Sequence, residues 1–136
     1  MDDIKFMTLA IKEAEKAYNI DEVPVGAVIV KNGNVIAKAY NRKEKDNVSI
    51  RHAELIAIEK ACLKLKSWRL DDCILYSTLE PCSMCMGAIK ESRISKVVYG
   101  CSKSKNYFPG NNLEIVGGIQ ENICLSLLHN FFENKR

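Results

Sequence analysis

The order of the predicted elements indicates an α/β fold, with a mixed β-sheet that carries helices on both faces. Two short β-branched runs, 25–30 and 35–39, come first as a hairpin, and the later strands alternate with helices. Hairpin strands pair antiparallel, whereas strands joined through a helix run parallel and need cover on both faces of the sheet. A length of 136 residues suits one domain, 1–136, and no internal repeat or linker interrupts it.

Each element has a local signal. Residues 2–18 predict a helix, because apolar residues recur at spacings of three and four between charged ones, and Asp2 or Asp3 can cap it. Asn32-Gly33 between the two first runs predicts a tight hairpin turn. The other expected elements are a loop over 41–49, helices over 52–66, 81–92 and 119–133, strands over 73–79, 94–100 and 113–116, and a turn-rich segment over 101–112.

Composition excludes several classes of protein. Hydrophobic residues make up 47% and charged residues 27% of the chain, which predicts a globular core. The sequence shows no apolar run of membrane-spanning length and no signal-peptide pattern, so we expect a cytoplasmic protein without a membrane partner. A net charge of +3 permits a nucleic-acid partner without requiring one. In a reducing cytosol, four cysteines are expected to be small buried residues: Cys62, Cys73, Cys101 and Cys124.

One imidazole and two thiols form the most informative motif. His-Ala-Glu stands at 52–54 and Pro-Cys-Ser-Met-Cys at 81–85. Zinc takes such mixed ligands, and a catalytic site keeps one position open for water, whereas a structural site closes with four protein ligands. The other histidine, His129, falls in the predicted C-terminal helix. We therefore predict a three-ligand zinc site formed by His52, Cys82 and Cys85, with Glu54 beside it to move protons.

The spacing fits two helix N-termini that meet at the metal. Cys82 and Cys85 are three residues apart, so one helical turn places both sulfurs on one side, and Pro81 suits the first turn. His52 and Glu54 are two residues apart, so they face one pocket only if His52 lies at the start of its helix. The partial positive charge of helix N-termini favours thiolates at this place.

Two other classes of protein remain open from the motif. A zinc-stabilised RNA-binding module without activity would need no Glu54 and would usually have a fourth ligand, for which Cys73 or Cys101 remains available. A redox protein with a Cys-x-x-Cys pair would leave His52 without a role.

Further stretches extend over nearly the whole chain: VPVGAVIV at 23–30, NRK at 41–43, RHAELIAI at 51–58, TLEPCSMC at 78–85, SRISKVVYG at 92–100 and a Phe pair near the C-terminus. Together with the His-x-Glu and Pro-Cys-x-x-Cys motif, they resemble the tRNA adenosine deaminases that make inosine at the wobble position. The resemblance implies a cytidine-deaminase-like three-layer α/β/α sandwich with a mixed five-stranded sheet. It also implies one Zn²⁺ per subunit, a homodimer, and the tRNA anticodon loop as partner.

The resemblance implies residue roles as well. His52, Cys82 and Cys85 match the zinc ligands, and Glu54 matches the proton shuttle for attack of water on C6 of adenine. Asn41 resembles the substrate-contacting asparagine of the family. Val25 resembles part of the pocket wall, with a core strand position as the alternative. Candidate RNA contacts are Arg42, Lys43, Phe131, Phe132, Lys135 and Arg136, with core packing as the alternative for the phenylalanines. Apart from the resemblance, the positive charges of Lys31, Lys38, Arg42, Lys43 and Lys45 suit phosphate contacts, with an ordinary solvated surface as the alternative for each.

Two features depart from the family pattern. The segment 101–112 is shorter than in the usual bacterial enzyme, which bears on RNA docking and dimer contacts. Arg51 stands where bacterial members commonly have a small residue. In addition, LDDCILY at 70–76 resembles guanine deaminases, so the alternative hypothesis is a deaminase of the same fold that acts on free guanine or cytosine.

Overall fold

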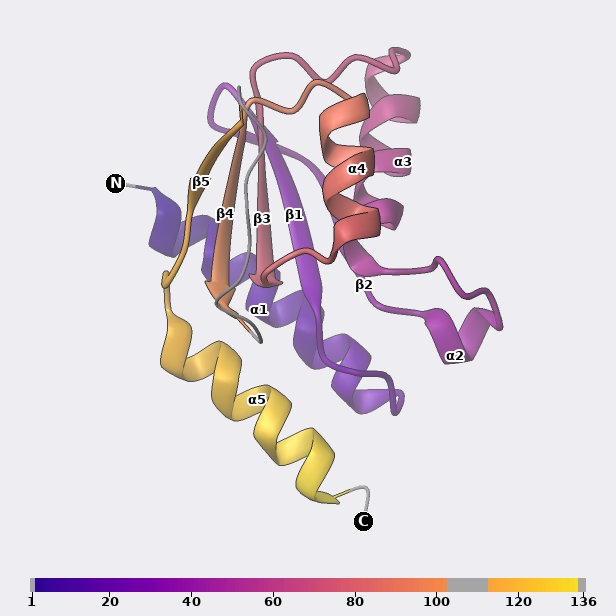
Figure 1. Cartoon of the computed structure of the whole chain (residues 1–136), viewed down its shortest axis with the longest axis vertical. Helices are drawn as coiled ribbons and strands as arrows, with labels where there is room; N and C mark the ends of the chain where they lie inside the picture. The colour runs from indigo at the N-terminus through magenta and orange to yellow at the C-terminus, as the bar shows by residue number, and fades with distance from the viewer. Residues whose placement is uncertain (1, 103–112, 135–136) are drawn as a thin grey trace.

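The computed structural model describes residues 2–102 and 113–134, which form a mixed α/β fold (Figure 1). Within these residues, a five-stranded sheet has the order β2-β1-β3-β4-β5. β1 runs antiparallel to β2 and β3, whereas β3, β4 and β5 are parallel, so the sheet is mixed as predicted. The strands are β1 (Gly26–Lys31), β2 (Asn34–Tyr40), β3 (Cys73–Leu79), β4 (Lys96–Cys101) and β5 (Glu114–Val116).

Helices cover both faces of this sheet and confirm the three-layer sandwich (Figure 1). On one face lie α1 (Asp3–Asn19) and α5 (Glu121–Asn134), and on the other lie α3 (Ala53–Leu65) and α4 (Ser83–Glu91). A four-residue helix, α2 (Lys43–Asp46), interrupts the connection from β2 to α3. The sequence analysis predicted only a loop there, and that prediction was wrong. None of the helices in the described part of the chain is long and apolar enough to cross a membrane.

The sheet separates two hydrophobic cores. Ala27 and Ile29 of β1 pack in the core under α3 and α4, whereas Val28 and Val30 pack in the core under α1 and α5. Side chains of a strand alternate between the two faces, so one strand can serve both cores. β1 is therefore buried almost throughout, whereas the edge strand β2 shows a partly exposed pattern.

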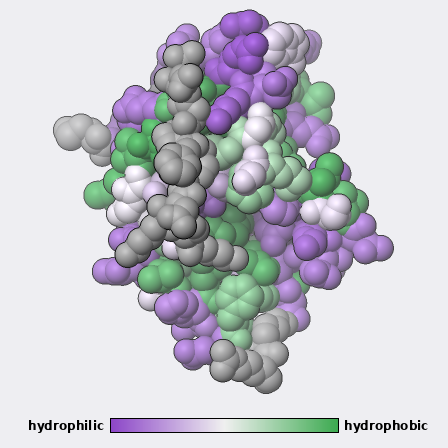
Figure 2. Space-filling model, viewed as in Figure 1, coloured by the Kyte–Doolittle hydropathy of each residue, from purple (hydrophilic) through white to green (hydrophobic). Residues whose placement is uncertain are grey.

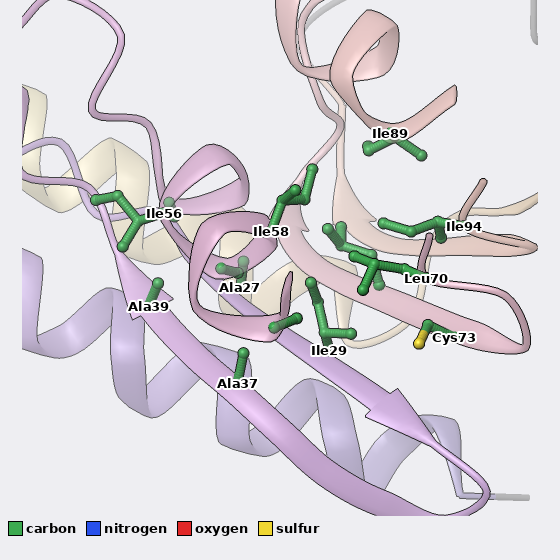
Figure 3. Packing of buried hydrophobic residues seen from close by; sticks show 14 of the residues in the cluster. Ala27, Ile29, Ala37, Ala39, Ile56, Ile58, Leu70, Cys73, Ile89 and Ile94 are labelled. Carbon is green, nitrogen blue, oxygen red and sulfur yellow. The ribbon is translucent and has the colours of Figure 1, made fainter. Parts of the chain in front are cut away.

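Small strand residues lie beneath α3. Figure 3 shows Ile56 and Ile58 of α3 in the same core as Ala27 of β1 and Ala37 and Ala39 of β2. Alanine side chains leave room for a helix with larger side chains to pack closely against the sheet. This packing fixes the position of α3, and thereby of its N-terminal end.

The hairpin turn has the predicted geometry. Asn32 has φ 51° and Gly33 has φ 80°, and a type I′ turn needs positive φ at both central residues. Lys31 pairs with Asn34 across the turn. At the other end of the hairpin, Gly26 pairs with Tyr40, so the chain leaves β2 beside the start of β1.

One edge of the sheet collects the chain segments that lead to the predicted metal ligands. Because β1 is antiparallel to both neighbours, its start lies beside the ends of β2 and β3. The chain runs from the end of β2 to His52, and from the end of β3 to Cys82. Figure 1 shows the N-terminal ends of α3 and α4 at this edge.

Two details of the predicted helix starts need correction. α4 begins at Ser83, and Cys82 is its N-cap with an extended backbone (φ −71°, ψ 174°), so Pro81 lies before the helix. At the start of α1, the side chain of Asp2 makes no capping hydrogen bond. The Asp3 carboxylate instead accepts a hydrogen bond from the Tyr76 hydroxyl at 2.7 Å, which ties α1 to β3.

Three of the four cysteines outside the motif are buried as expected: Cys73, Cys101 and Cys124. Cys62 is only half-buried, and its thiol donates to the Trp68 carbonyl oxygen at 3.8 Å. The expectation for Cys62 was therefore wrong, because it lies towards the exposed end of α3.

Two glycines allow helices to approach the sheet closely. A Cβ at Gly26 would lie 2.0 Å from the Ala10 carbonyl oxygen of α1. A Cβ at Gly100 would lie 2.3 Å from the Cys124 Sγ of α5 and 2.8 Å from the Thr78 carbonyl oxygen. At both places a side chain would push a helix away from the strand.

We expect Gly100→Ala to lower the free energy of unfolding by about 1–3 kcal/mol, because overpacking of a filled site forces neighbouring groups to move. Gly87→Ala in α4 is the matched control, since a Cβ there has no neighbour within 4 Å. It should instead raise stability by up to about 1 kcal/mol, because alanine is the better helix former. Urea unfolding of the zinc-loaded variants measures both effects. Equal stability of the two variants would contradict this view of the α5 contact.

Candidate metal centre

The three predicted metal ligands come together at the starts of two helices. His52 is the N-cap of α3, Cys82 is the N-cap of α4, and Cys85 lies in the first turn of α4. Their ligand atoms all lie within 4.8 Å of one another. His52 Nδ1 is 3.8 Å from Cys82 Sγ and 3.6 Å from Cys85 Sγ. Tetrahedral zinc with ordinary bond lengths places such donors about 3.5 Å apart, so the donor set fits the ion.

No fourth ligand joins this group among residues 2–102 and 113–134. Cys73 and Cys101, the two cysteines considered as a fourth ligand, are not members, and the Cys101 thiol donates to the Thr78 carbonyl oxygen at 3.5 Å. His129 is exposed on α5, on the opposite face of the sheet. Three protein ligands are typical of catalytic zinc sites, which counts against a closed structural site.

Burial controls the ionisation of the ligands. Cys85 is fully buried, and this burial, together with the nearby Glu54 carboxyl and Cys82, raises the pKa of the Cys85 thiol. Burial also lowers the pKa of His52, with the Lys43 charge as a second cause. The imidazole is thus held neutral, as ligation requires, and a thiolate at Cys85 needs a compensating cation.

Glu54 is a buried carboxyl group beside the ligands. It lies in the first turn of α3 and is only 4% exposed, and burial raises its pKa to about 7. Its own backbone N–H and the Ser77 hydroxyl oppose that shift by hydrogen bonding. The Ser77 hydroxyl also donates to the Leu79 carbonyl oxygen at 2.7 Å. A carboxyl group in these surroundings can take up and release a proton near neutral pH.

Asn41 and Val25 lie together at the same edge of the sheet. The Asn41 side-chain amide donates to the Val23 carbonyl oxygen at 3.2 Å, and its side-chain oxygen accepts from the Lys43 N–H at 3.2 Å. The Asn41 backbone N–H donates to the Val25 carbonyl oxygen at 3.0 Å. Both residues are 8% exposed, and Val25 belongs to the core under α3. Their contact with a substrate stays a prediction.

The predicted cationic RNA contacts differ in how they are held. The Arg42 guanidinium makes hydrogen bonds of 3.1–3.2 Å to the Asp46 carboxylate and donates to the Tyr40 hydroxyl at 3.0 Å. Lys43 is exposed. Figure 2 shows hydrophilic side chains, in purple, at the side of the molecule where α2 lies. Of the further candidates, Lys38 and Lys45 are exposed and Lys31 is half-buried.

The aromatic pair of α5 is split between core and surface. Phe131 is buried and packs edge-to-face against Tyr18 of α1, with ring centroids 5.9 Å apart, as the core alternative predicted. Phe132 is 44% exposed. Lys135 and Arg136 lie outside the described residues, and so does most of the segment 101–112.

Arg51 forms ion pairs with both α2 and α3. Its guanidinium lies 3.6 Å from an Asp46 carboxylate oxygen and 3.4 Å from a Glu59 carboxylate oxygen. The Arg51 carbonyl oxygen also accepts from the Arg42 N–H at 3.1 Å. Arg51 therefore links both ends of the segment that precedes His52.

Sequence reasoning missed Ser77 and Glu22. Ser77 is fully buried on β3, and Glu22 is 1% exposed just before β1. A buried glutamate before a strand has no periodic signal in the sequence. Its role becomes visible only through its contacts with Glu44 and Lys45, which are distant in the chain.

The family model for the cytidine and deoxycytidylate deaminase zinc-binding region matches residues 1–101. The chain is 43% identical to the tRNA-specific adenosine deaminase of Bacillus subtilis, over 98% of this chain and 91% of that protein. The chain belongs to the tRNA-specific adenosine deaminase family. It is therefore a hydrolytic deaminase, and the family match and the ligand cluster together show one Zn²⁺ as its cofactor.

Other relatives agree with this family. The protein of the same name from Rickettsia bellii is 42% identical, over 96% of this chain and 99% of that protein. The alignment with the Bacillus subtilis deaminase spans 146 positions, more than the 136 residues of this chain, so this member of the family lacks residues that its relative has.

Two solved structures bear on the substrate class. One comes from a study of A-to-I editing by tRNA:A34 deaminases, with 36% identity and a TM-score of 0.84 over 91% of this chain and 99% of that chain. The other is the guanine deaminase of Bacillus subtilis, with 43% identity and a TM-score of 0.69 over 72% of this chain and 63% of that chain. The first likeness extends over nearly all of both chains, whereas the second does not.

The two histidines of the chain allow a matched test of metal binding. We expect purified His52→Ala to hold well under one zinc per chain, because one of the three donors clustered in the described part of the chain is removed. His129→Ala should keep about one zinc per chain, because His129 is exposed far from the cluster. Elemental analysis by mass spectrometry measures both. Equal zinc content in the two variants would rule out His52 as a ligand.

Proposed function

We propose that this chain, as one deaminase domain over 1–136, converts the wobble adenosine of tRNA to inosine. His52, Cys82 and Cys85 hold the zinc ion, and Glu54 is the proton shuttle. The observation that carries the proposal is the three-donor cluster with a buried glutamate beside it. The whole-chain likeness to a tRNA:A34 deaminase supports the choice of substrate.

The chemistry follows from the position of Glu54. Zinc supplies an activated water when it is bound. The Glu54 carboxylate accepts a proton from that water and gives it to the N1 nitrogen of adenine. Glu54 then transfers the second water proton to the leaving amino group, so that water replaces ammonia at C6. One carboxyl group can act first as base and then as acid, because each proton that Glu54 takes from the water is afterwards given up, which restores the carboxylate.

Asn41 and Val25 orient the base in this proposal. The Asn41 side chain uses one N–H and one oxygen lone pair within the protein, and so retains a second N–H and a second lone pair for a purine. Val25 supplies an apolar wall. An anticodon-loop adenosine is already unpaired, so turning it into such a pocket costs little.

Contacts with the rest of the anticodon loop come from the positive side chains around the α2 segment. Lys43 and Lys45 are exposed there, and Arg42 is partly exposed. By resemblance to the family, the proposal extends to Phe132 of α5 and to Lys135 and Arg136, which follow in the sequence, with Phe131 supporting the helix from within. It also includes a homodimer and a place in the cytoplasm.

Free-guanine deamination is the second candidate function. The structural likeness to the guanine deaminase of Bacillus subtilis and the LDDCILY stretch favour it. Both candidates use the same metal chemistry, so the substrate decides between them.

We expect the zinc-loaded protein to form inosine in an anticodon stem-loop with a wobble adenosine, and to leave free guanine, cytosine and adenine unchanged. Raising the salt concentration from about 50 to about 200 mM should weaken stem-loop binding at least about tenfold, because several phosphate contacts release counterions. Inosine analysis, ammonia release and binding titrations measure these effects. Ammonia from guanine with an unchanged stem-loop would establish the second candidate instead.

We expect Glu54→Ala to keep its zinc and to lose turnover by about 10²–10⁴-fold or more, because the proton shuttle is removed and the metal donors remain. Glu91→Ala is the control, since Glu91 is an exposed carboxylate at the end of α4, and it should retain full turnover. Turnover and metal content are measured on the same preparations. Near-normal turnover of Glu54→Ala would exclude the proposed role.

A further inference from the structure

The helix α2 is placed next to the metal centre without any hydrophobic anchor. None of its four residues is buried, so packing cannot hold it in position. It nevertheless lies between Asn41 and His52, the residues at the two ends of the connection from β2 to α3. A polar segment of this kind needs specific hydrogen bonds to keep one conformation.

A buried carboxylate supplies those hydrogen bonds. Glu22 is 1% exposed, and its two carboxylate oxygens accept from the backbone N–H groups of Glu44 at 3.1 Å and Lys45 at 2.5 Å. The first N–H groups of a helix have no partner within the helix, so a carboxylate there satisfies two of them at once. Glu22 and the turn are thus mutually dependent, since a buried carboxylate also needs donors.

The same strip of chain also holds Asn41. The carbonyl oxygen of Val23, next to Glu22, accepts from the Asn41 side-chain amide, and the Val25 carbonyl oxygen accepts from the Asn41 backbone N–H. The Asn41 side-chain oxygen accepts from the Lys43 N–H, which belongs to the turn that Glu22 holds. The orientation of the Asn41 amide therefore depends on the position of this turn.

We propose that Glu22 is a positioning residue for the deamination reaction, which fixes the turn 41–45 so that the Asn41 amide faces the bound base. The inference rests on the proposed function in one respect, the contact of Asn41 with the base. A carboxylate is needed for this role because both of its oxygens accept, whereas the amide of a glutamine would direct an NH₂ group at one of the two backbone donors.

A double-mutant cycle tests whether Glu22 acts through Asn41. We expect Glu22→Gln to lower kcat/KM about tenfold, mainly through KM, because a misplaced amide weakens binding of the base. In an Asn41→Ala background, the same substitution should change kcat/KM less than about twofold. Additive effects of the two substitutions, or an Asn41→Ala variant with full activity, would overturn the proposal.

Glu13→Gln is the matched control for loss of a buried carboxylate. Glu13 is 4% exposed on α1 and pairs with Lys16 at 2.8 Å, away from the turn. Any effect of Glu13→Gln on kcat/KM should be the same in the wild-type protein and in the Asn41→Ala background. A Glu13→Gln variant that couples to Asn41 as strongly as Glu22→Gln would show only a general response to destabilisation, and would refute the specific role.

A second measurement needs no substrate. In Glu22→Gln, amide hydrogen exchange at Glu44 and Lys45 should become about tenfold faster, while exchange in β1 stays unchanged, because only the turn loses a hydrogen bond. If Glu22→Gln does not fold, Glu22→Asp, which keeps the charge on a shorter side chain, should show the same local change to a smaller degree. Unchanged exchange at both amides in a folded variant would overturn the proposal.

These experiments separate the inference from the proposed function. The cycle is measured on whichever substrate the wild-type protein deaminates, stem-loop or free base, because Asn41 is expected to contact the base in both. Failure of the stem-loop assay with a coupled cycle on guanine would reject the tRNA substrate and support Glu22. Stem-loop editing with additive effects would support the tRNA substrate and reject Glu22.

Discussion

The meeting of two helix N-termini at the cluster of His52, Cys82 and Cys85 is the constraint on which the rest of the structure depends. His52 precedes α3, Cys82 precedes α4, and their donor atoms must come within about 4 Å of each other to share one zinc ion. The antiparallel β1 strand makes this possible, because its start lies beside the ends of β2 and β3, from which the chain runs to the two helices. The two cores then hold the helices at fixed distances from the sheet.

Two glutamates of this chain are buried but have different hydrogen-bond partners. The Glu22 carboxylate accepts two backbone N–H hydrogen bonds and thereby fixes a turn. Glu54 is buried to a similar degree, but burial outweighs its hydrogen bonds and raises its pKa to about 7. Glu22 is bound by two backbone N–H groups of the turn, whereas the raised pKa of Glu54 suits this carboxyl to proton exchange near neutral pH. In the proposed function, the partners of each buried carboxyl, and not burial alone, therefore distinguish the positioning role of Glu22 from the proton transfer of Glu54.

The sequence predicted the elements that bury an apolar face, because apolar residues recur at the period of the helix or strand on the side that packs in the core. It also predicted the Asn32-Gly33 turn and the pairing of His52 with the two motif cysteines, since these depend on local chemistry and on known ligand preferences. The α2 segment was missed for the same physical reason: it buries no residue, so its pattern resembles a loop, and its anchor at Glu22 is distant in the chain. The position of Pro81 before α4 was missed by two residues, because a cysteine without a side-chain capping hydrogen bond occupies the N-cap.

Two kinds of contact hold the turn 41–45 and helix α2 in place, partly exposed ion pairs and buried hydrogen bonds, and salt weakens them to different degrees. Asp46 is bound by Arg42 and approached by Arg51, and these partly exposed ion pairs weaken as salt screens them. The Glu22 hydrogen bonds are buried and are screened far less. In the proposed function, an RNA phosphate would compete with Asp46 for Arg42 and Arg51, while the buried Glu22 hydrogen bonds would still hold the turn. Under that proposal, the polar and exposed helix α2 would help to bind a charged substrate while Asn41 keeps its hydrogen bonds to Val23 and Lys43.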